Sequence, residues 1–178
     1  IDSRRYLART FPEALPLRLS HQRYPGYRRM IGENWMHWQD YYECFVALSG
    51  RGEFRAGNDI FAFEPGDIVI VDPLKIHGVM AMEAAHTALV LLFPARLVAA
   101  TPGDLDQGFL AAWDQRRAGG PPMLRAGEKG SVAAHEALLD LARLWFGHPQ
   151  PQKHALEMKL HFLRLCFHLS QALGAPLP

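Results

Sequence analysis

Cysteine is scarce in this sequence, with only Cys44 and Cys166 among 178 residues. Two cysteines make no disulfide framework, so we expect a reducing compartment and a cytoplasmic protein. Both fall in apolar surroundings, which favours inert, buried side chains. The sequence also has no Cys-x-x-Cys pair, no glycine-rich phosphate loop and no Ser-His-Asp or Cys-His arrangement, so the usual signatures of redox, nucleotide and covalent chemistry are missing.

Charge of one sign and long hydrophobic runs are lacking as well. The chain has 19 Lys and Arg against 18 Asp and Glu. This balance gives no reason to expect nucleic acid or an anionic membrane as a partner of this segment. No apolar run could span a bilayer, and no signal-peptide pattern opens the chain. A hydrophobic content of 49% is ordinary for one globular domain with a core.

The two ends of the sequence predict that it is a piece of a longer protein. The first residue is Ile1 rather than methionine, and the last five residues, GAPLP, resemble a linker. We therefore expect part of the function to lie in a segment that this sequence does not contain.

Residues 24–93 are rich in aromatic and β-branched side chains and are interrupted by turn signals. The signals are SGRGE at residues 49–53, AGND at 56–59 and EPGD at 64–67, the last of which leads into the apolar run IVIV. Short strands separated by frequent turns predict an antiparallel sandwich or barrel.

After Pro94 the pattern becomes helical, and it predicts about three helices, over residues 104–117, 131–146 and 152–173. The inward faces of the first two carry Leu105, Phe109, Ala112 and Trp113, and then Ala134, Ala137, Leu138, Leu141 and Trp145.

The last predicted helix is apolar over more of its surface than one neighbouring helix usually covers, so it implies the barrel or another subunit as a second partner. Its polar residues form one narrow stripe: His154, Glu157, His161, Arg164, His168 and Gln171. Histidines at every seventh position are compatible with an intersubunit metal or a pH switch. A solvated face or interface rim explains them better.

The stretch HWQDYYECFVALSG, residues 37–50, places polar residues at even spacing in a predicted strand. If the strand is unbroken, His37, Gln39 and Glu43 share one face, because residues two apart in a strand point the same way. Phe45 continues that face, which predicts that it lines the interior.

A second histidine, His77, follows the strand predicted from PGDIVIV. If the two strands are neighbours, His37, Glu43 and His77 converge, and this donor set suits a divalent metal such as Zn, Ni, Fe or Mn. Gln39 would add a weak carbonyl ligand or none. The alternative is a polar network without metal, since buried polar groups need partners in either case.

Aromatic residues cluster around the candidate ligands. Alternation places Trp35 and Tyr41 on the ligand face and Trp38 and Tyr42 on the other. Aromatic faces suit sugars or aromatic effectors, although plain packing explains them equally well. His86, at the start of the last predicted strand, is expected at the surface or hydrogen-bonded, or else lining the barrel mouth.

These motifs resemble those of the cupin family. Residues 37–50 are similar in spacing to the first cupin motif, His-x-His-x(3,4)-Glu-x6-Gly, and residues 66–77 to the second, which ends in a metal-binding histidine. Gln39 replaces the second histidine, and Asp72 and Leu74 replace the usual proline and glycine. The resemblance implies a mainly β fold: a small cupin barrel (double-stranded β-helix, jelly-roll) followed by helices. It also implies metal binding weaker than in a four-ligand cupin, or none.

A narrower resemblance covers about residues 24–93, where the sequence is similar to the sensor domain of AraC/XylS-type transcriptional regulators. This resemblance implies a homodimer formed by the C-terminal helices, with DNA bound only through a missing C-terminal domain that carries two helix-turn-helix motifs. The implied organisation is an N-terminal arm (1–23), a cupin barrel (24–95), a helical dimerisation segment (96–173) and the start of a linker (174–178).

We therefore expect an effector-sensing and dimerisation domain without enzymatic activity or a required cofactor. The effector would be a small molecule, a sugar or a carboxylate, bound by Trp35, His37, Gln39, Tyr41, Glu43, Phe45 and His77. The metal alternative uses His37, Gln39, Glu43 and His77. Two other readings stay open: a small metal-dependent cupin enzyme, such as a dioxygenase or isomerase, and a cupin domain kept only for assembly.

Overall fold

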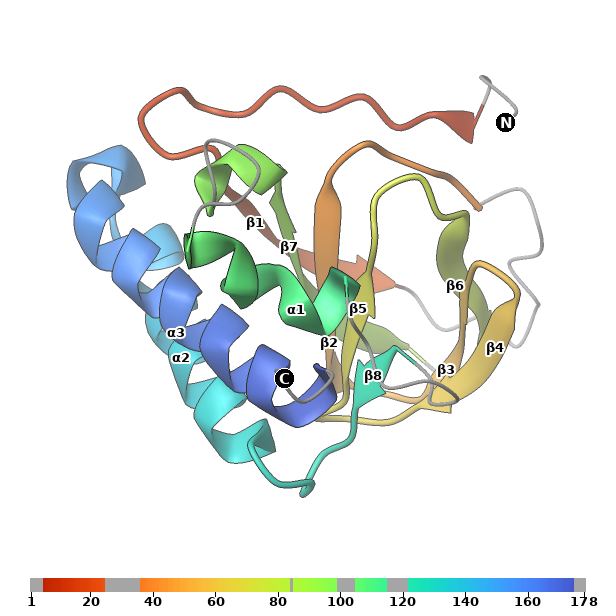
Figure 1. The fold of residues 1–178 in the computed structure, drawn as a ribbon. Coiled ribbons are helices and arrows are strands. Elements are labelled where there is room, and N and C mark those ends of the chain that lie inside the picture. Colours follow the sequence, from red (N-terminus) through yellow and green to blue (C-terminus); the bar gives the residue numbers. More distant parts are fainter. Residues whose placement is uncertain (1–4, 25–35, 84, 99–104, 115–121, 175–178) are drawn as a thin grey trace.

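The computed structural model describes residues 5–24, 36–83, 85–98, 105–114 and 122–174. Two antiparallel sheets face each other, and a helical layer covers the outer face of the larger sheet (Figure 1). Trp35, which was expected on the ligand face, lies outside the described residues.

The strands of the two sheets are adjacent in an order that differs from their order in the chain. The larger sheet has the order β1-β7-β2-β5-β8 and the smaller sheet the order β4-β3-β6. The strand bounds are β1 Arg18–Tyr24, β2 Tyr42–Ser49, β3 Gly52–Ala56, β4 Asp59–Phe63, β5 Ile68–Val71, β6 His77–Met82, β7 His86–Phe93 and β8 Met123–Leu124.

The three turns predicted within the β region are confirmed. SGRGE separates β2 from β3, AGND joins β3 to β4, and EPGD joins β4 to β5. In the last of these, Gly66 has φ +91°, a left-handed conformation that side chains with a Cβ rarely adopt. The prediction of a mainly β fold is therefore confirmed. It depended on the residues at the turns, whose preferences are local.

The prediction of about three helices is wrong, because the described residues contain two long helices, α2 (Ser131–Gly147) and α3 (Ala155–Leu173). Most of the first predicted helix is a 3₁₀ segment, η4 (Leu105–Leu110), followed by the single turn α1 (Ala111–Asp114). Gly108 lies inside this segment, and a glycine in a helix interior costs about 1 kcal/mol relative to alanine. Two further 3₁₀ turns are η3 (Ala95–Leu97) and η5 (Pro151–His154).

Strand β2 separates two hydrophobic cores. Its residues Tyr42, Cys44 and Val46 face the outer core, between the larger sheet and the helices. Phe45 and Ala47 face the inner core, between the two sheets. The predicted alternation is thus confirmed within β2. Cys44 and Cys166 are both free and buried in the outer core, where burial raises the pKa of each thiol.

Strand β1, apart from Tyr24, lies within the predicted N-terminal arm (1–23). It pairs with β7 along its whole length. Leu19 packs in the outer core, whereas Tyr24 packs against the inner core. Since side chains alternate along a strand, Ser20 and Gln22 share the inner face with Tyr24. This segment forms one edge of the larger sheet.

The two long helices bury one face against the larger sheet and leave apolar side chains on the opposite face. On α3, Met158, Phe162 and Leu165 are completely buried. The exposed apolar side chains are Leu156, Leu160 and Phe167 of α3, and Val132, Leu139 and Phe146 of α2. The barrel therefore covers only part of the wide apolar face that the sequence indicates.

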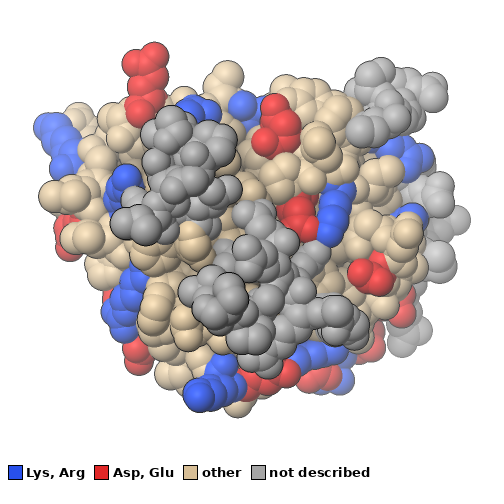
Figure 2. Space-filling model, viewed as in Figure 1, with Lys and Arg blue, Asp and Glu red and all other residues tan. Residues whose placement is uncertain are grey.

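Part of the polar stripe of α3 contacts α2. Arg164 Nη2 lies 3.4 Å from Oε2 of Glu136, and Arg164 Nη1 and His161 Nδ1 each lie 3.7 Å from Oδ2 of Asp140. Charges of both signs are interspersed over the described residues on the face shown in Figure 2. Among the described residues, no helix is both long and apolar enough to cross a membrane.

Candidate functional site

The segment that carries His37 and Gln39 is not part of a continuous strand with Glu43. Strand β2 begins at Tyr42, and residues 40 and 41 form a bend. The expectation of one unbroken strand from residue 37 is therefore wrong, and alternation alone does not place His37 on the face of Glu43.

A backbone bridge brings His37 to the site instead. His37 N–H donates to the carbonyl of His77 at 3.1 Å, and His77 N–H donates to the carbonyl of His37 at 2.9 Å. Their ring centroids are 4.3 Å apart. Because the two histidines face each other across this isolated antiparallel bridge, the start of β6 positions both side chains.

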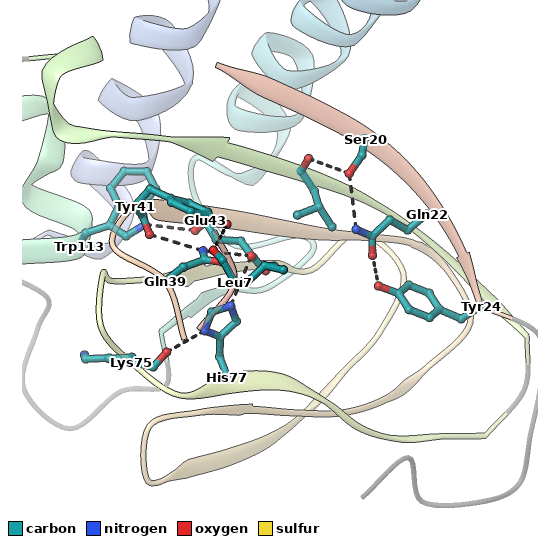
Figure 3. A network of polar contacts seen from close by, with 11 residues as sticks. Leu7, Ser20, Gln22, Tyr24, Gln39, Tyr41, Glu43, Lys75, His77 and Trp113 are labelled. Atoms are coloured by element: carbon teal, nitrogen blue, oxygen red, sulfur yellow. Dashed lines mark hydrogen bonds and ion pairs between the residues drawn. The ribbon is translucent and has the colours of Figure 1, made fainter. Parts of the chain in front are cut away.

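Glu43 completes a compact group of three potential metal ligands. One donor atom from each of His37, Glu43 and His77 lies within 4.8 Å of the others. Figure 3 shows Gln39, Glu43 and His77 directed toward one another between the sheets. The convergence that the sequence predicted for these side chains is thus present, by a different backbone route.

Gln39 supports Glu43 through its amide nitrogen. The residue is completely buried, and its Nε2 donates to Oε2 of Glu43 at 3.3 Å and to the carbonyl of Tyr41 at 3.4 Å. Its Oε1 is buried and has no hydrogen-bond partner within the described part of the chain. In this orientation Gln39 positions the carboxylate, and its free oxygen is the group that a ligand or cation would use.

The orientation of His77 is set by the backbone carbonyl of Lys75, which lies 2.8 Å from Nδ1. With Nδ1–H donating there, Nε2 faces Glu43 Oε2 at 3.3 Å. Burial opposes a charge on His77, but the charge of Glu43 and the hydrogen bonds to Glu43 and Lys75 outweigh it and raise its pKa above 6.5. In the metal-free protein a proton on Nε2 therefore joins the two side chains.

The carboxylate of Glu43 is stabilised in its charged form. Burial would raise the pKa of Glu43, but the attraction of His77, the hydrogen bond from His77, the nearby His37 and the amide of Gln39 together lower it below 4.5. Glu43 is therefore ionised at neutral pH, as a metal ligand or an ion-pair partner must be.

Aromatic side chains connect the site to the N-terminal segment and to the helical segment. The Tyr41 hydroxyl donates to the carbonyl of Leu7 at 3.0 Å, and Trp113 Nε1 of α1 donates to the backbone carbonyl of Glu43 at 3.3 Å. Trp38 faces away and packs on Tyr6, with ring centroids 4.6 Å apart. The sequence offered no signal for the contacts of Leu7 and Trp113, because both join residues far apart in the chain.

Residue 74 shows how the departure from the second cupin motif affects the backbone. Leu74 has φ +65°, a left-handed conformation that is uncommon for a residue with a Cβ. Its N–H donates to the carbonyl of Gln39 at 2.6 Å, so the strained residue holds the bend that carries Gln39. A glycine, which the motif usually has here, would adopt this conformation without strain.

The donor set fits a divalent metal. Two imidazoles and a carboxylate would bind Zn, Mn, Fe or Ni with further coordination positions open, and a histidine whose second nitrogen donates to a carbonyl is typical of metal sites. Gln39, whose buried Oε1 has no hydrogen-bond partner among the described residues, occupies the position of the remaining ligand in the motif. Without metal, His77 and Glu43 form an ion pair. The arrangement is therefore compatible with both a metal-bound and a metal-free site.

No protein-family model matches this sequence, and no curated protein matches it. Similar solved structures include a cupin 2 conserved barrel domain protein from Salinispora arenicola, with 22% identity, a TM-score of 0.36, and coverage of 49% of this chain and 71% of that one. A cupin protein from Bacteroides fragilis has 17% identity, a TM-score of 0.39, and coverage of 44% and 66%.

The oxalate decarboxylase of Bacillus subtilis, a protein with Mn(II) centres, has 19% identity and a TM-score of 0.36. The match covers 44% of this chain and 21% of that one. These structural neighbours are cupin-fold proteins. Similarities this low assign neither a family nor an activity to the present chain.

Proposed function

We propose that this chain is the effector-sensing and dimerisation domain of an AraC/XylS-type transcription regulator. The observation that carries the proposal is the pair of hydrogen bonds that join the polar site to the segments on either side of the barrel in the chain. Through Tyr41 and the bend before it the site contacts the N-terminal arm, and through Trp113 it contacts the helical segment. A ligand that moves this strand would move both.

The arm contacts the site through its backbone as well as through a side chain. Leu7 N–H donates to the carbonyl of Trp38 at 2.9 Å, and Trp38 N–H donates to the carbonyl of Arg5 at 3.0 Å. Both bonds are made by Trp38, the residue after His37. A group bound at His37 would therefore affect the hydrogen bonds that hold the N-terminal arm. The ligand shifts the equilibrium between two packings only by the difference in its affinity for them.

The exposed apolar residues of the helices support the dimer. Leu156, Leu160 and Phe167 of α3 recur at intervals of four and seven residues, which places them on one side of the helix. A second copy of the chain would cover this side, and DNA would be bound only by a C-terminal domain beyond this segment.

The ligand in this proposal is a sugar or a carboxylate, and a divalent metal is an optional part of the site. His37, Glu43 and His77 would hold the metal, which when bound would supply a Lewis-acidic anchor for an effector oxygen. Gln39 would keep Glu43 oriented, and the carbonyl of Lys75 would keep Nε2 of His77 directed into the site.

A metal-dependent cupin enzyme, such as a dioxygenase or an isomerase, is the second candidate. It is favoured by the same three ligands, since two histidines and one carboxylate leave coordination positions open for a substrate. Under this alternative the residues already described would bind the metal and hold the substrate beside it.

Metal analysis combined with thermal shift separates the two candidates. For sensing, we expect stabilisation of the chain by members of a sugar and carboxylate panel, lost in Glu43→Gln and retained in the surface control Glu83→Gln. For the enzyme, we expect stoichiometric metal that disappears in His77→Ala, with turnover of a panel compound. Metal-dependent turnover would overturn the sensing proposal. Absence of any response would leave only the assembly role.

A further inference from the structure

His86 is a buried histidine with no hydrogen-bond partner for either ring nitrogen within the described residues. The residue begins β7 and is 1% exposed. The predictions of an exposed or a hydrogen-bonded His86 are therefore both wrong. Buried polar side chains in native proteins almost always have a partner, so two orphaned nitrogens on one ring require an explanation.

The surroundings of His86 are aromatic. Its ring stacks on Tyr24 with centroids 4.3 Å apart and planes 14° apart, and it meets the edges of Phe63 and Phe45 at 5.6 and 6.4 Å. Burial lowers the pKa of His86 below 6.5, so the ring is neutral at physiological pH. A neutral imidazole offers one N–H donor and one acceptor nitrogen.

The loop after β2 packs closely against His86. Gly50 has φ +75°, and a Cβ at this position would lie 2.5 Å from Cβ of His86. Glycine therefore allows the loop to approach Cα and Cβ of His86 and the carbonyl of Ala85 closely. Tyr24, which stacks on the His86 ring, is only half-buried.

The inner face of β1 extends the polar surface away from His86. The Tyr24 hydroxyl donates to Oε1 of Gln22, Gln22 Nε2 donates to Ser20 Oγ at 3.5 Å, and Ser20 Oγ donates to the carbonyl of Val90 at 3.5 Å (Figure 3). Each member of this row has a partner. His86, which pairs with Tyr24 in the sheet register, is the one position of the row where hydrogen-bonding capacity is unused.

This position is distinct from the site at Glu43. Glu43 pairs with Leu92, six residues further along β7 than His86, which corresponds to roughly 20 Å at 3.3 Å per residue. Phe45 lies between them, with its ring 5.1 Å from Phe54. Among the described residues, His86 and Glu43 therefore lie at different levels of β7 with Phe45 between them, although the charge of Glu43 still contributes to the raised pKa of Tyr24.

We propose that His86 and Tyr24 form a second recognition site, which binds an uncharged hydroxyl group carried on an aromatic or alicyclic body. A hydroxyl both donates and accepts, as a neutral imidazole requires, and the rings of Phe45 and Phe63 suit an apolar body beside it. A carboxylate fits poorly, since it only accepts and would be buried beside an uncharged histidine. Tyr24 is the side chain that such a ligand displaces or stacks on.

This inference deepens the proposed sensing function and rests on it only in identifying the ligand with the effector. The test uses benzyl alcohol and phenol as probes, with benzoate as the matched charged compound. The ring nitrogens of His86 are followed in ¹H–¹⁵N spectra of the 178-residue chain. We expect saturable shifts with both alcohols and none with benzoate.

Two variants make the test specific. His86→Phe keeps the ring and removes the nitrogens, so we expect affinity for benzyl alcohol to fall at least tenfold while the melting temperature rises, because two unpaired polar atoms are lost. Arg143→Gln alters an exposed side chain of α2 outside this site and serves as the control, with affinity within about twofold of the original. Equal affinity in His86→Phe, a lower melting temperature in that variant, or no shift of the His86 nitrogens would each overturn the proposal.

The outcomes also separate this site from the sensing function. Binding of benzyl alcohol at His86 without any effect on DNA binding by a chain that includes the proposed DNA-binding domain would leave this site standing and overturn the identification of its ligand with the effector. An effector that acts with His86→Phe as well as with the original chain would leave sensing standing and remove this site from it.

Discussion

His77 and Glu43 meet between the two sheets at a single contact, 3.3 Å from Nε2 to Oε2. Since Nδ1 of His77 is occupied by the carbonyl of Lys75, only a proton or a cation can join the two atoms favourably. The residues that would bind a metal are therefore also an ion pair in its absence, and the two states compete for the same position.

The first prediction concerns the pH dependence of stability. The pKa of His77 is raised above 6.5, so its contribution is present below pH 6.5 and is lost as pH rises through the raised value. The pKa of Glu43 is lowered below 4.5, so its contribution is present above pH 4.5 and is lost as pH falls through the lowered value. The pair should therefore stabilise the metal-free chain most between pH 4.5 and pH 6.5, where both contributions are present.

Urea unfolding in chelator tests this window by comparing the original chain with His77→Gln at pH 5.5 and 8.5. We expect the difference in the free energy of unfolding to be larger at pH 5.5. Arg143→Gln is the control, because Arg143 forms an exposed pair with Asp140. A larger difference at pH 8.5 would contradict the assignment of the proton to His77.

The second prediction concerns the fourth motif position. Gln39→His adds an imidazole next to Glu43, and we expect the affinity for Zn or Mn to rise about tenfold or more, equivalent to about 1.4 kcal/mol. Gln39→Met removes the amide without adding a ligand and should show no such gain. Competition titration with a chelating dye measures both, and an unchanged affinity in Gln39→His would argue against a metal site here.

The third prediction concerns backbone strain at Leu74. A bulky residue at φ +65° carries a penalty of about 1–2 kcal/mol. Glycine avoids this penalty but loses more chain entropy on folding, so a glycine here recovers only part of it. We expect Leu74→Gly to stabilise the chain by about 1 kcal/mol and Leu74→Ala, which keeps a Cβ, to give no such gain. Thermal unfolding of the two variants decides the point.

The fourth prediction concerns the buried carboxylate of the EPGD turn. Asp67 accepts hydrogen bonds from Arg125 Nη1 at 2.8 Å, from Ala126 N at 2.9 Å and from Glu64 N at 2.9 Å, so it joins the turn to the loop before α2. Asp67→Ala removes the acceptor of the Ala126 and Glu64 N–H groups and the charged partner of Arg125, and it should cost about 3 kcal/mol of stability. Glu83→Ala, which breaks an exposed pair, should cost less than about 1 kcal/mol.

The fifth prediction concerns self-association. We expect Leu160→Glu or Phe167→Glu to weaken the proposed dimer at least about tenfold, since each places a charge in an interface core. Ile60→Glu alters an equally exposed apolar residue on β4 and should have no effect. Sedimentation velocity measures all three, and a monomeric original chain at high micromolar concentration would remove the dimer from the proposal.

The sequence predicted the parts of this protein that depend on neighbouring residues. A turn residue such as Gly66 acts within about four positions, and alternation within β2 separates Cys44 from Phe45 because the strand repeat is two. The spacing of His37, Glu43 and His77 indicated the candidate residues through the resemblance to the two cupin motifs, whereas alternation alone did not place His37 beside Glu43. The prediction of the first helix, over residues 104–117, failed where local helix propensity was weakest, around Gly108.

Only the tertiary structure decided what depends on pairings distant in the chain. The bend at residues 40 and 41 would carry His37 off the face of Glu43, and the bridge to His77 returns it there. The orphaned nitrogens of His86 follow from its burial beside Tyr24 and Gly50, neither of which is near it in sequence. Residue order fixes local periods and turns, whereas the partners of a buried polar group depend on which strands become neighbours.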